Sequence, residues 1–251
     1  MVQIPELVRY CDELLASADF RDYAPNGLQV EGTRPVRRLV SAVTATRDVI
    51  EEAEAAGADA LLVHHGYFWK GEPAALTGMK GERVRRLMTA GISLLAYHLP
   101  LDAHGELGNN ACLGERLGLQ VESVQPAGGV PGLLWFGTPA EAGPEALASR
   151  IETVTGRAPL QVGAGPGQLR RVAWCTGAAQ GFLGEAVAHG ADAFISGEVS
   201  ERTTHEAREL GIHYFAAGHH ATERYGVQAL GARLADVFGL EHRYIEDDNP
   251  V

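Results

Sequence analysis

A chain of 251 residues has room for one large domain or two small ones, and a hydrophobic content of 45% is ample for a core. The formal net charge of -11 argues against a nucleic-acid partner, because binding to phosphates needs a basic surface. No apolar run approaches the ~20 residues of a membrane span and nothing resembles a signal peptide, so we expect no membrane partner. Three isolated cysteines make a disulfide framework unfavourable, so we expect a cytoplasmic protein.

The first half of the sequence alternates between predicted strands and predicted helices. An amphipathic helix at the start leads into a turn-rich loop around Asn26-Gly27, which we interpret as a connector. Buried strands are expected at residues 39–43, 60–63 and 92–97, with helices around residues 49–53, 84–88 and 109–117. This alternation is typical of βαβ units, so we predict an α/β fold with mainly parallel sheets.

The second half of the sequence repeats the first. Residues 38–60 align without a gap onto residues 171–193, an offset of 133, and both segments end in Gly-Ala-Asp-Ala. Chance similarity between alanine-rich helices is the alternative, but the shared motif and frame favour an internal duplication. The stretch from Gln125 to Gly132 is rich in glycine and proline and is the best linker candidate. We therefore predict two similar α/β domains, residues 1–125 and 126–251, and the last helix and strand could pack back on the first.

Two adjacent histidines follow the most apolar predicted strand. His64 and His65 come directly after residues 60–63, and Gly66 allows the chain to turn there. In open α/β sheets, functional groups gather at the carboxyl ends of the strands. The pair is therefore a candidate metal site, and two ordinary strand-end histidines are the alternative. With the offset of 133, the pair falls on Gly197 and Glu198.

In each half, the next strand is followed by a histidine with a carboxylate four residues later. These pairs are His98 with Asp102 and His219 with Glu223. A helix is expected to begin near residue 220, which places His219 and Glu223 on one helix face. Pro100 disfavours a regular helix, so we expect His98 and Asp102 to converge through a loop. Two equivalent domains that face each other would bring these groups together at their interface.

The candidate ligands are imidazoles and carboxylates without thiolates. Such a set suits zinc, iron, manganese, cobalt or nickel and does not distinguish among them, and the three isolated cysteines lack metal-binding spacing. Five ligands exceed the need of one four-coordinate zinc ion. Two divalent metal ions sharing a carboxylate, about 3.5–4 Å apart, fit better. The five are His64, His65, Asp102, His219 and Glu223.

Several blocks resemble the Nif-three-like family, whose members are often named GTP cyclohydrolase 1 type 2 homologues. The blocks span nearly the whole chain and are residues 26–30, 60–72, 97–102, 195–198, 218–223 and 249–251. The resemblance implies two similar α/β domains with a dinuclear metal site between them and a homo-oligomer, a toroidal hexamer. It places the family's metal ligands on the same five residues and places His98 beside the site. The short linker implies the compact form without an inserted domain.

The most concrete functional hypothesis is a metal-dependent hydrolase with a small-molecule substrate, nucleotide-like or phosphorylated, of cyclohydrolase or phosphoesterase type. His98 is the best-placed acid/base and Glu198 the second. Glu198 could instead cap the helix that follows it. Trp69 and its neighbours Tyr67 and Phe68 could stack on a nucleobase or pack the loop. The alternative function is a non-catalytic metal-binding protein or a regulatory or scaffold assembly.

Overall fold

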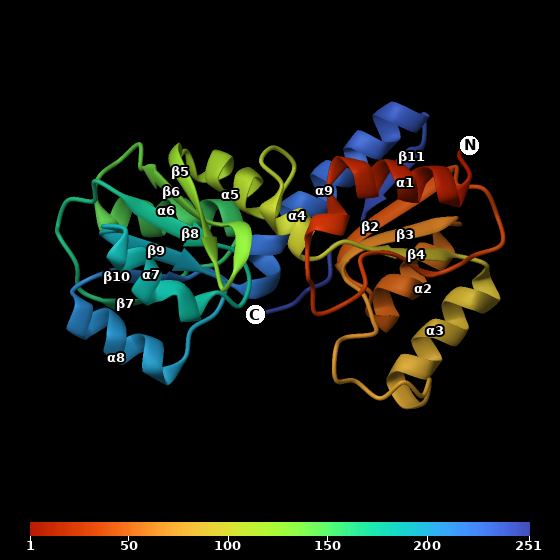
Figure 1. Cartoon of the computed structure of the whole chain (residues 1–251), viewed down its shortest axis with the longest axis horizontal. Coiled ribbons are helices and arrows are strands. Elements are labelled where there is room, and N and C mark those ends of the chain that lie inside the picture. Colours follow the sequence, from red (N-terminus) through yellow and green to blue (C-terminus); the bar gives the residue numbers. More distant parts are fainter. The chain divides into compact units, whose positions relative to one another are not determined.

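Each of two compact units is built on one β-sheet with helices around it (Figure 1). The computed structural model describes residues 1–251 without a gap. The first unit comprises Met1–Leu101 and Gly226–Asp248, and the second comprises Asp102–Tyr225 and Asn249–Val251. The predicted α/β class is confirmed. The predicted boundary after residue 125 lies inside a strand of the second sheet.

The first sheet has five strands in the order β1-β4-β3-β2-β11. They are β1 (Gly27–Val30), β2 (Arg38–Thr44), β3 (Ala60–His65), β4 (Ser93–Ala96) and β11 (Glu241–Tyr244). Strands β11, β2, β3 and β4 run parallel, and β1 pairs antiparallel with β4. The helices of this unit are α1 (Ile4–Leu14), the short 3-10 helix η1 (Ser17–Asp19), α2 (Arg47–Ala55) and α3 (Gly78–Ala90). The prediction of a mainly parallel sheet is confirmed for this unit.

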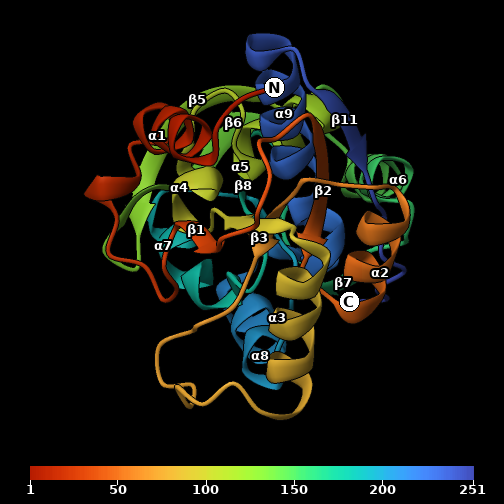
Figure 2. The same cartoon turned by 90° about the vertical axis from the view of Figure 1, so that its right-hand side faces the viewer.

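Both faces of the first sheet are covered by helices, because successive side chains of a strand point to opposite faces. Leu61 and Val63 pack in one apolar cluster with residues of α2 and α3. Leu62 packs in the other cluster with residues of α1 and of the last long helix. Figure 2 shows α2 and α3 on one side of the strands and α1 on the other. Strand β3 is therefore buried on both faces, as its continuous apolar sequence predicts.

The second sheet has six strands in the order β5-β6-β8-β9-β10-β7. They are β5 (Gln120–Ala127), β6 (Val130–Thr138), β7 (Leu160–Gly163), β8 (Val172–Cys175), β9 (Ala193–Ser196) and β10 (His213–Ala216). Strands β8, β9 and β10 are parallel, whereas β5, β6 and β7 join by antiparallel pairing. The helices are α5 (Asn109–Leu117), α6 (Pro144–Thr155), the short 3-10 helix η2 (Gln180–Phe182), α7 (Leu183–Ala188) and α8 (Glu201–Leu210). This sheet is mixed, not mainly parallel as predicted.

The two units share one strand order and one register, which confirms the internal duplication. The order β1-β4-β3-β2 in the first sheet corresponds to β7-β10-β9-β8 in the second. Leu39 pairs with Ala60 and Val172 pairs with Ala193, so the offset of 133 is kept across the sheets. Asp59 accepts hydrogen bonds from the backbone N–H groups of residues 37 and 38, and Asp192 accepts them from residues 170 and 171.

The predicted linker is the tip of a β-hairpin. Strands β5 and β6 pair antiparallel, and Gly128 and Gly129 form the turn with φ values of 58° and 80°. A two-residue hairpin turn of this kind needs positive φ at both positions, which glycine adopts without a steric penalty. The same composition that marks a linker therefore also marks a tight hairpin, and the linker prediction is wrong.

Two helices contain two of the three points at which the chain passes from one unit to the other, and the third lies between Asp248 and Asn249. The helices are α4 (Leu99–Ala103) and α9 (His219–Phe238). The start of α9 agrees with the predicted helix near residue 220. The predicted loop from His98 to Asp102 is wrong, because Pro100 lies in the first turn of α4, where its missing N–H has no helical partner to lose. No helix is both long enough and apolar enough to span a membrane.

Candidate metal centre

His64 and His65 lie at the carboxyl end of β3, as predicted. His64 is fully buried, whereas His65 is partly exposed. The chain turns sharply at Gly66, where a Cβ atom would lie 2.2 Å from Gln29 Oε1. The Gln29 amide oxygen accepts a hydrogen bond from the Tyr67 N–H at 2.7 Å. The lack of a side chain at Gly66 thus lets the loop after the histidines close against β1.

The Nδ1 atoms of both histidines are held by oxygen atoms of the first unit. His64 Nδ1 lies 2.9 Å from the carbonyl oxygen of Tyr97 and donates to it, because a carbonyl can only accept. His65 Nδ1 lies 3.3 Å from Thr44 Oγ1. For a neutral His64 imidazole, a proton on Nδ1 puts the ring lone pair on Nε2. In metal-binding histidines, the ring nitrogen that does not bind the metal usually forms a hydrogen bond to an oxygen atom, which orients the ring.

His98 completes a group of three imidazoles in the first unit. One ring nitrogen from each of His64, His65 and His98 lies within 4.8 Å of the others, a spacing that could hold a metal ion. The ring centroids of His64 and His98 are 5.0 Å apart. His98 was expected beside the metal ligands and not among them, whereas the structure brings its ring into the same cluster as His64 and His65.

Asp22 holds His98 in place, although sequence analysis interpreted its loop as a connector. Asp22 Oδ1 lies 2.7 Å from His98 Nδ1 and also accepts the Tyr23 N–H. Asp22 Oδ2 accepts from Asn26 Nδ2 and the Leu99 N–H, both at 2.9 Å. Burial by itself would raise the pKa of Asp22, but the hydrogen bond and charge of His98, with the Asn26 and Tyr23 N–H groups, lower it to about 2. Asp22 is therefore an ionised acceptor at neutral pH.

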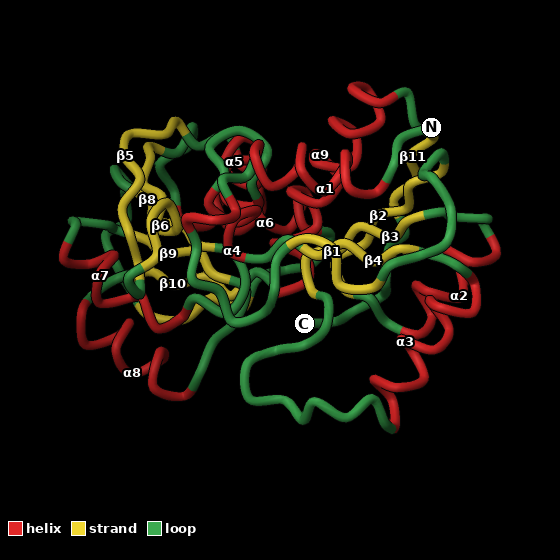
Figure 3. The backbone as a smooth tube through the Cα atoms, turned by 45° about the vertical axis from the view of Figure 1, so that its right-hand side comes forward, coloured by secondary structure: helices red, strands yellow, loops and turns green.

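Three consecutive aromatic residues, Tyr67, Phe68 and Trp69, follow His65 and Gly66, and each lies in a different environment. Tyr67 is buried in the core and donates from its hydroxyl to the Ala45 carbonyl, so it packs the loop. Phe68 adopts a φ of 66°, which is uncommon for a bulky residue. The Trp69 ring centroid lies 5.0 Å from that of His98 and 5.9 Å from that of His65. Figure 3 shows this loop, residues 66–77, as the long connection that leads into α3.

The second unit gathers carboxylates around one histidine. His219 and Glu223 lie one turn apart at the start of α9, with His219 Nε2 3.1 Å from Glu223 Oε2. His219 Nδ1 lies 2.7 Å from Glu198 Oε1, and Gln180 donates to Glu198 Oε2. The N-cap of α8 is Ser200, within a capping box, so the suggestion that Glu198 caps this helix is wrong. Glu198 instead orients His219.

The carboxylates around His219 raise its affinity for a proton. Burial lowers the pKa of His219, but the hydrogen bonds and charges of Glu223 and Glu198 outweigh burial and raise the pKa to about 9. The group thus attracts positive charge at the point where these side chains converge. A divalent cation supplies that charge as well as a proton does, so binding of the ion would release a proton.

Asp102, like Glu223, is a buried carboxylate of this unit. Its side chain accepts from Asn109 Nδ2 at 2.8 Å and from Thr176 Oγ1 at 3.3 Å. Asp102 and Glu223 offer carboxylate oxygens within 4.8 Å of each other. Asn109 and Thr176 were missed by sequence analysis, because neither carries a charge or a recognisable spacing.

A glycine makes room for the carboxylate of Glu223. Gly177 follows β8 with a φ of 69°, and a Cβ atom there would lie 2.0 Å from Glu223 Oε1. By the offset of 133, Gly177 corresponds to Thr44, the residue whose hydroxyl supports His65. At this equivalent position, the first unit has a hydroxyl that contacts His65, and the second unit has a glycine that leaves space for Glu223.

The donor atoms of both units fit divalent ions. Imidazole nitrogens and carboxylate oxygens suit zinc and the neighbouring transition metals, and the buried cysteines take no part in either cluster. Each histidine of the predicted ligand set is supported at Nδ1 by an oxygen atom. These features define the class as a duplicated α/β protein with a candidate metal centre built from histidines and carboxylates.

Comparison with known families agrees with this class. The sequence profile of DUF34/NIF3 (NGG1p interacting factor 3) matches residues 2–250. The chain therefore belongs to the DUF34/NIF3 family, which confirms the resemblance seen in the sequence. A protein of Allochromatium vinosum named GTP cyclohydrolase 1 type 2 homolog is 57% identical over 100% of this chain and 98% of its own length. A protein of Pseudomonas aeruginosa with the same name is 51% identical over 100% of this chain and 99% of its own length.

Solved structures share the fold over the full length. The structure described as protein ybgI, of unknown function, is 48% identical with a TM-score of 0.95 and covers 100% of both chains. The structure of TTHA1606 from Thermus thermophilus is 37% identical with a TM-score of 0.90 and also covers 100% of both chains. The fold of this chain is thus shared with solved structures that are 37–48% identical in sequence.

Proposed function

We propose that this protein binds two divalent metal ions and acts as a metal-dependent hydrolase. The proposed ligands are His64, His65, Asp102, His219 and Glu223. The observation that carries the proposal is the oxygen atom next to Nδ1 of each ligand histidine, a support that engages Nδ1 and assigns metal binding to Nε2. The Tyr97 carbonyl and the Glu198 carboxylate can only accept, so they require Nδ1–H on His64 and His219. The buried carboxylates of Asp102 and Glu223 add the negative charge that a pair of cations requires.

The reaction class follows from the residues beside the ligands. Bound divalent ions supply an activated water and stabilise negative charge that develops on the substrate. His98, held at Nδ1 by Asp22, is the group that transfers a proton to or from the substrate. Glu198 is the second acid/base of this proposal, and its bond to His219 gives it the additional role of orienting a ligand.

The substrate is proposed to be a small nucleotide-like or phosphorylated molecule. Two observations support this class. Trp69 lies next to His65 and His98 and offers an aromatic face on which a heterocycle can stack. The relatives from Allochromatium vinosum and Pseudomonas aeruginosa carry the name GTP cyclohydrolase 1 type 2 homolog, and GTP is a purine nucleotide. We also propose that the chains assemble into a ring-shaped homohexamer, which light scattering after size exclusion would test by giving six chain masses.

The test loads the purified protein separately with zinc, manganese, iron, cobalt and nickel. Each form is assayed for ring opening of GTP and for hydrolysis of phosphomonoesters and phosphodiesters. His64→Ala and Glu223→Ala should each remove most of the turnover, whereas His205→Ala, at an exposed position on α8, should leave it unchanged. Turnover in none of the metal-loaded forms would contradict the hydrolase. If the protein binds metal but turns over none of these substrates, the alternative function, a non-catalytic metal-binding protein, would be supported.

A further inference from the structure

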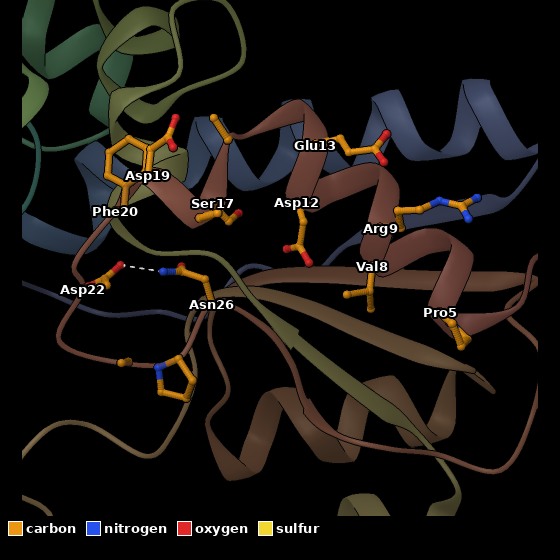
Figure 4. Close-up of a pocket in the computed structure, with 14 residues that line it drawn as sticks. Pro5, Val8, Arg9, Asp12, Glu13, Ser17, Asp19, Phe20, Asp22 and Asn26 are labelled. Atoms are coloured by element: carbon orange, nitrogen blue, oxygen red, sulfur yellow. Dashed lines mark hydrogen bonds between the residues drawn. The ribbon is translucent and has the colours of Figure 1, made fainter.

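The loop from Asp22 to Asn26 forms hydrogen bonds to the backbone of His98 and Leu99. Asn26 Oδ1 accepts the His98 N–H at 2.7 Å, and Asn26 Nδ2 donates to Asp22 Oδ2. Figure 4 shows Asp22 and Asn26 turned toward each other, joined by this last bond. The loop is thus fixed to the backbone of residues 98 and 99 by its own side chains.

The Asp22 side chain makes one contact that anchoring of the loop does not require. Its bonds to the Tyr23 N–H, the Leu99 N–H and Asn26 connect the loop to the backbone. The additional bond, from His98 Nδ1 at 2.7 Å, connects the carboxylate to an imidazole. Because the Asp22 side chain is only 3% exposed, this bond is shielded from water.

The second unit contains the same kind of pair in an equivalent place. His98 follows β4 and His219 follows β10, the corresponding strands of the two sheets. His219 Nδ1 also meets a carboxylate, Glu198, at 2.7 Å. The two carboxylates come from different parts of the fold, Asp22 from the loop before β1 and Glu198 from the loop after β9. The same contact therefore arises twice from unrelated segments.

We propose that Asp22 is a positioning residue that fixes the ring orientation and the Nδ1–H tautomer of His98. With its proton on Nδ1, a neutral His98 ring keeps its lone pair on Nε2, the atom with which it accepts a proton from the reacting molecule. The Trp69 ring packs edge to face against the His98 ring, with an angle of 88° between the two ring planes, and so restricts rotation of the imidazole. The role in proton transfer rests on the hydrolase proposed above.

A pocket next to Asp22 is distinct from the imidazole cluster. It has a volume of about 860 Å³ and is lined by α1, η1 and the loop that includes Asp22 and Asn26 (Figure 4). Asp19 lines this pocket as well and is exposed. Asp19 provides a matched control, because it is an aspartate of the same pocket, three positions before Asp22 in the chain.

The experiment compares four single variants and one double variant of the full chain. Asp22→Ala removes the carboxylate, His98→Ala removes the ring, and the double variant removes both. Asn26→Ala weakens the anchoring of the loop but keeps the bond between Asp22 and His98. Asp19→Ala is the control. The two readouts are kcat and KM of the metal-loaded protein, and the protonation of His98 Nδ1 and Nε2 by ¹⁵N NMR of the protein as purified.

We expect Asp22→Ala to lower kcat about 10- to 100-fold, with KM changed less than about threefold. In the His98→Ala background, removal of Asp22 should have no further effect on kcat, because the residue acts through the ring. In NMR spectra, the wild type should show the Nδ1–H form of His98. Asp22→Ala should lose this form, and Asn26→Ala and Asp19→Ala should keep it.

Equal protonation of His98 in the wild type and in Asp22→Ala would overturn the proposal. So would an Asn26→Ala variant with the same loss of kcat as Asp22→Ala, or a loss from Asp22→Ala that is additive with His98→Ala. The NMR readout needs no substrate. If no metal-loaded form shows turnover, the hydrolase proposal fails, and the NMR comparison still decides whether Asp22 fixes the tautomer of His98.

Discussion

The two units have the same scaffold but present different chemistry at equivalent strand ends. In the first unit, β3 ends in His64 and His65, and in the second, β9 is followed by Gly197 and Glu198. The first unit thus contributes nitrogen donors, and the second gathers the carboxylates around His219. Duplication has kept the strand order and register while the residues just beyond the strands have changed. The framework and the chemistry of this fold are therefore separable.

The loops after these strands differ in the same way. Residues 66–77 form a long connection before α3 that includes Trp69, whereas residues 197–200 lead almost directly into α8. In contrast, the aspartates that join neighbouring strands at the opposite ends, Asp59 and Asp192, make the same two backbone contacts in both units. In each sheet, the amino ends of the parallel strands carry contacts that stabilise the fold, and the carboxyl ends carry the candidate functional groups.

The largest effect is expected where the supports of the ligand histidines differ most. Glu198 gives His219 a charged acceptor at 2.7 Å, and Thr44 gives His65 a neutral one at 3.3 Å. Because charge-assisted bonds are stronger, Glu198→Gln should lower metal affinity about 10- to 100-fold, and Thr44→Val less than about fivefold. Titration against a fluorescent chelator measures both. An equal or larger loss for Thr44→Val would contradict the comparison.

A smaller effect is expected in the pH dependence of the metal-free protein. The pKa of His219 is raised in the folded state to about 9 from an ordinary value of 6.5. The stabilisation from its proton is therefore complete below pH 6.5 and is lost as the pH rises through 9. The free energy of unfolding should fall by about 1–3 kcal/mol over this range. Urea unfolding of the chelator-treated protein measures the fall, and His219→Gln should abolish it.

The smallest difference is expected between the two structural aspartates. Asp59→Ala and Asp192→Ala each remove the side-chain acceptor of two backbone N–H groups, so each should cost about 1–3 kcal/mol of stability. Because the contacts are equivalent, the two losses should agree within about 0.5 kcal/mol. Thermal unfolding of both variants tests this agreement. A loss several times larger in one unit would show that the duplicated contacts have diverged in their contribution to stability.

The sequence predicted the long helices and the buried strands better than the turns and short helices that connect them. The buried run before His64, the offset of 133 and the helix at residues 109–117 were all recognised, because each has a local and periodic signal. The hairpin of β5 and β6 was not recognised, because Gly128 and Gly129 also suit a linker. Pro100 was interpreted as a helix breaker, because its place in the first turn depends on where α4 begins.

The candidate site was predicted only in its charged and imidazole residues. His219 and Glu223 have the spacing of one helical turn, so their contact was expected. Asp22 was missed, because it lies far along the chain from His98 and is brought to it by a loop without a repeating pattern. Asn109 and Thr176 were missed for a similar reason, since their contacts to Asp102 depend on the packing of α4, α5 and β8.

The central proposal is that His64, His65 and His219, together with the carboxylates of Asp102 and Glu223, bind a pair of cations. The most direct measurement is the metal content of protein purified without chelators, together with that of His64→Ala and Glu223→Ala. The account predicts two divalent ions per chain in the wild type and a loss of metal in both variants, although they alter different units. Wild-type protein without divalent ions, or a variant with unchanged metal content, would contradict it.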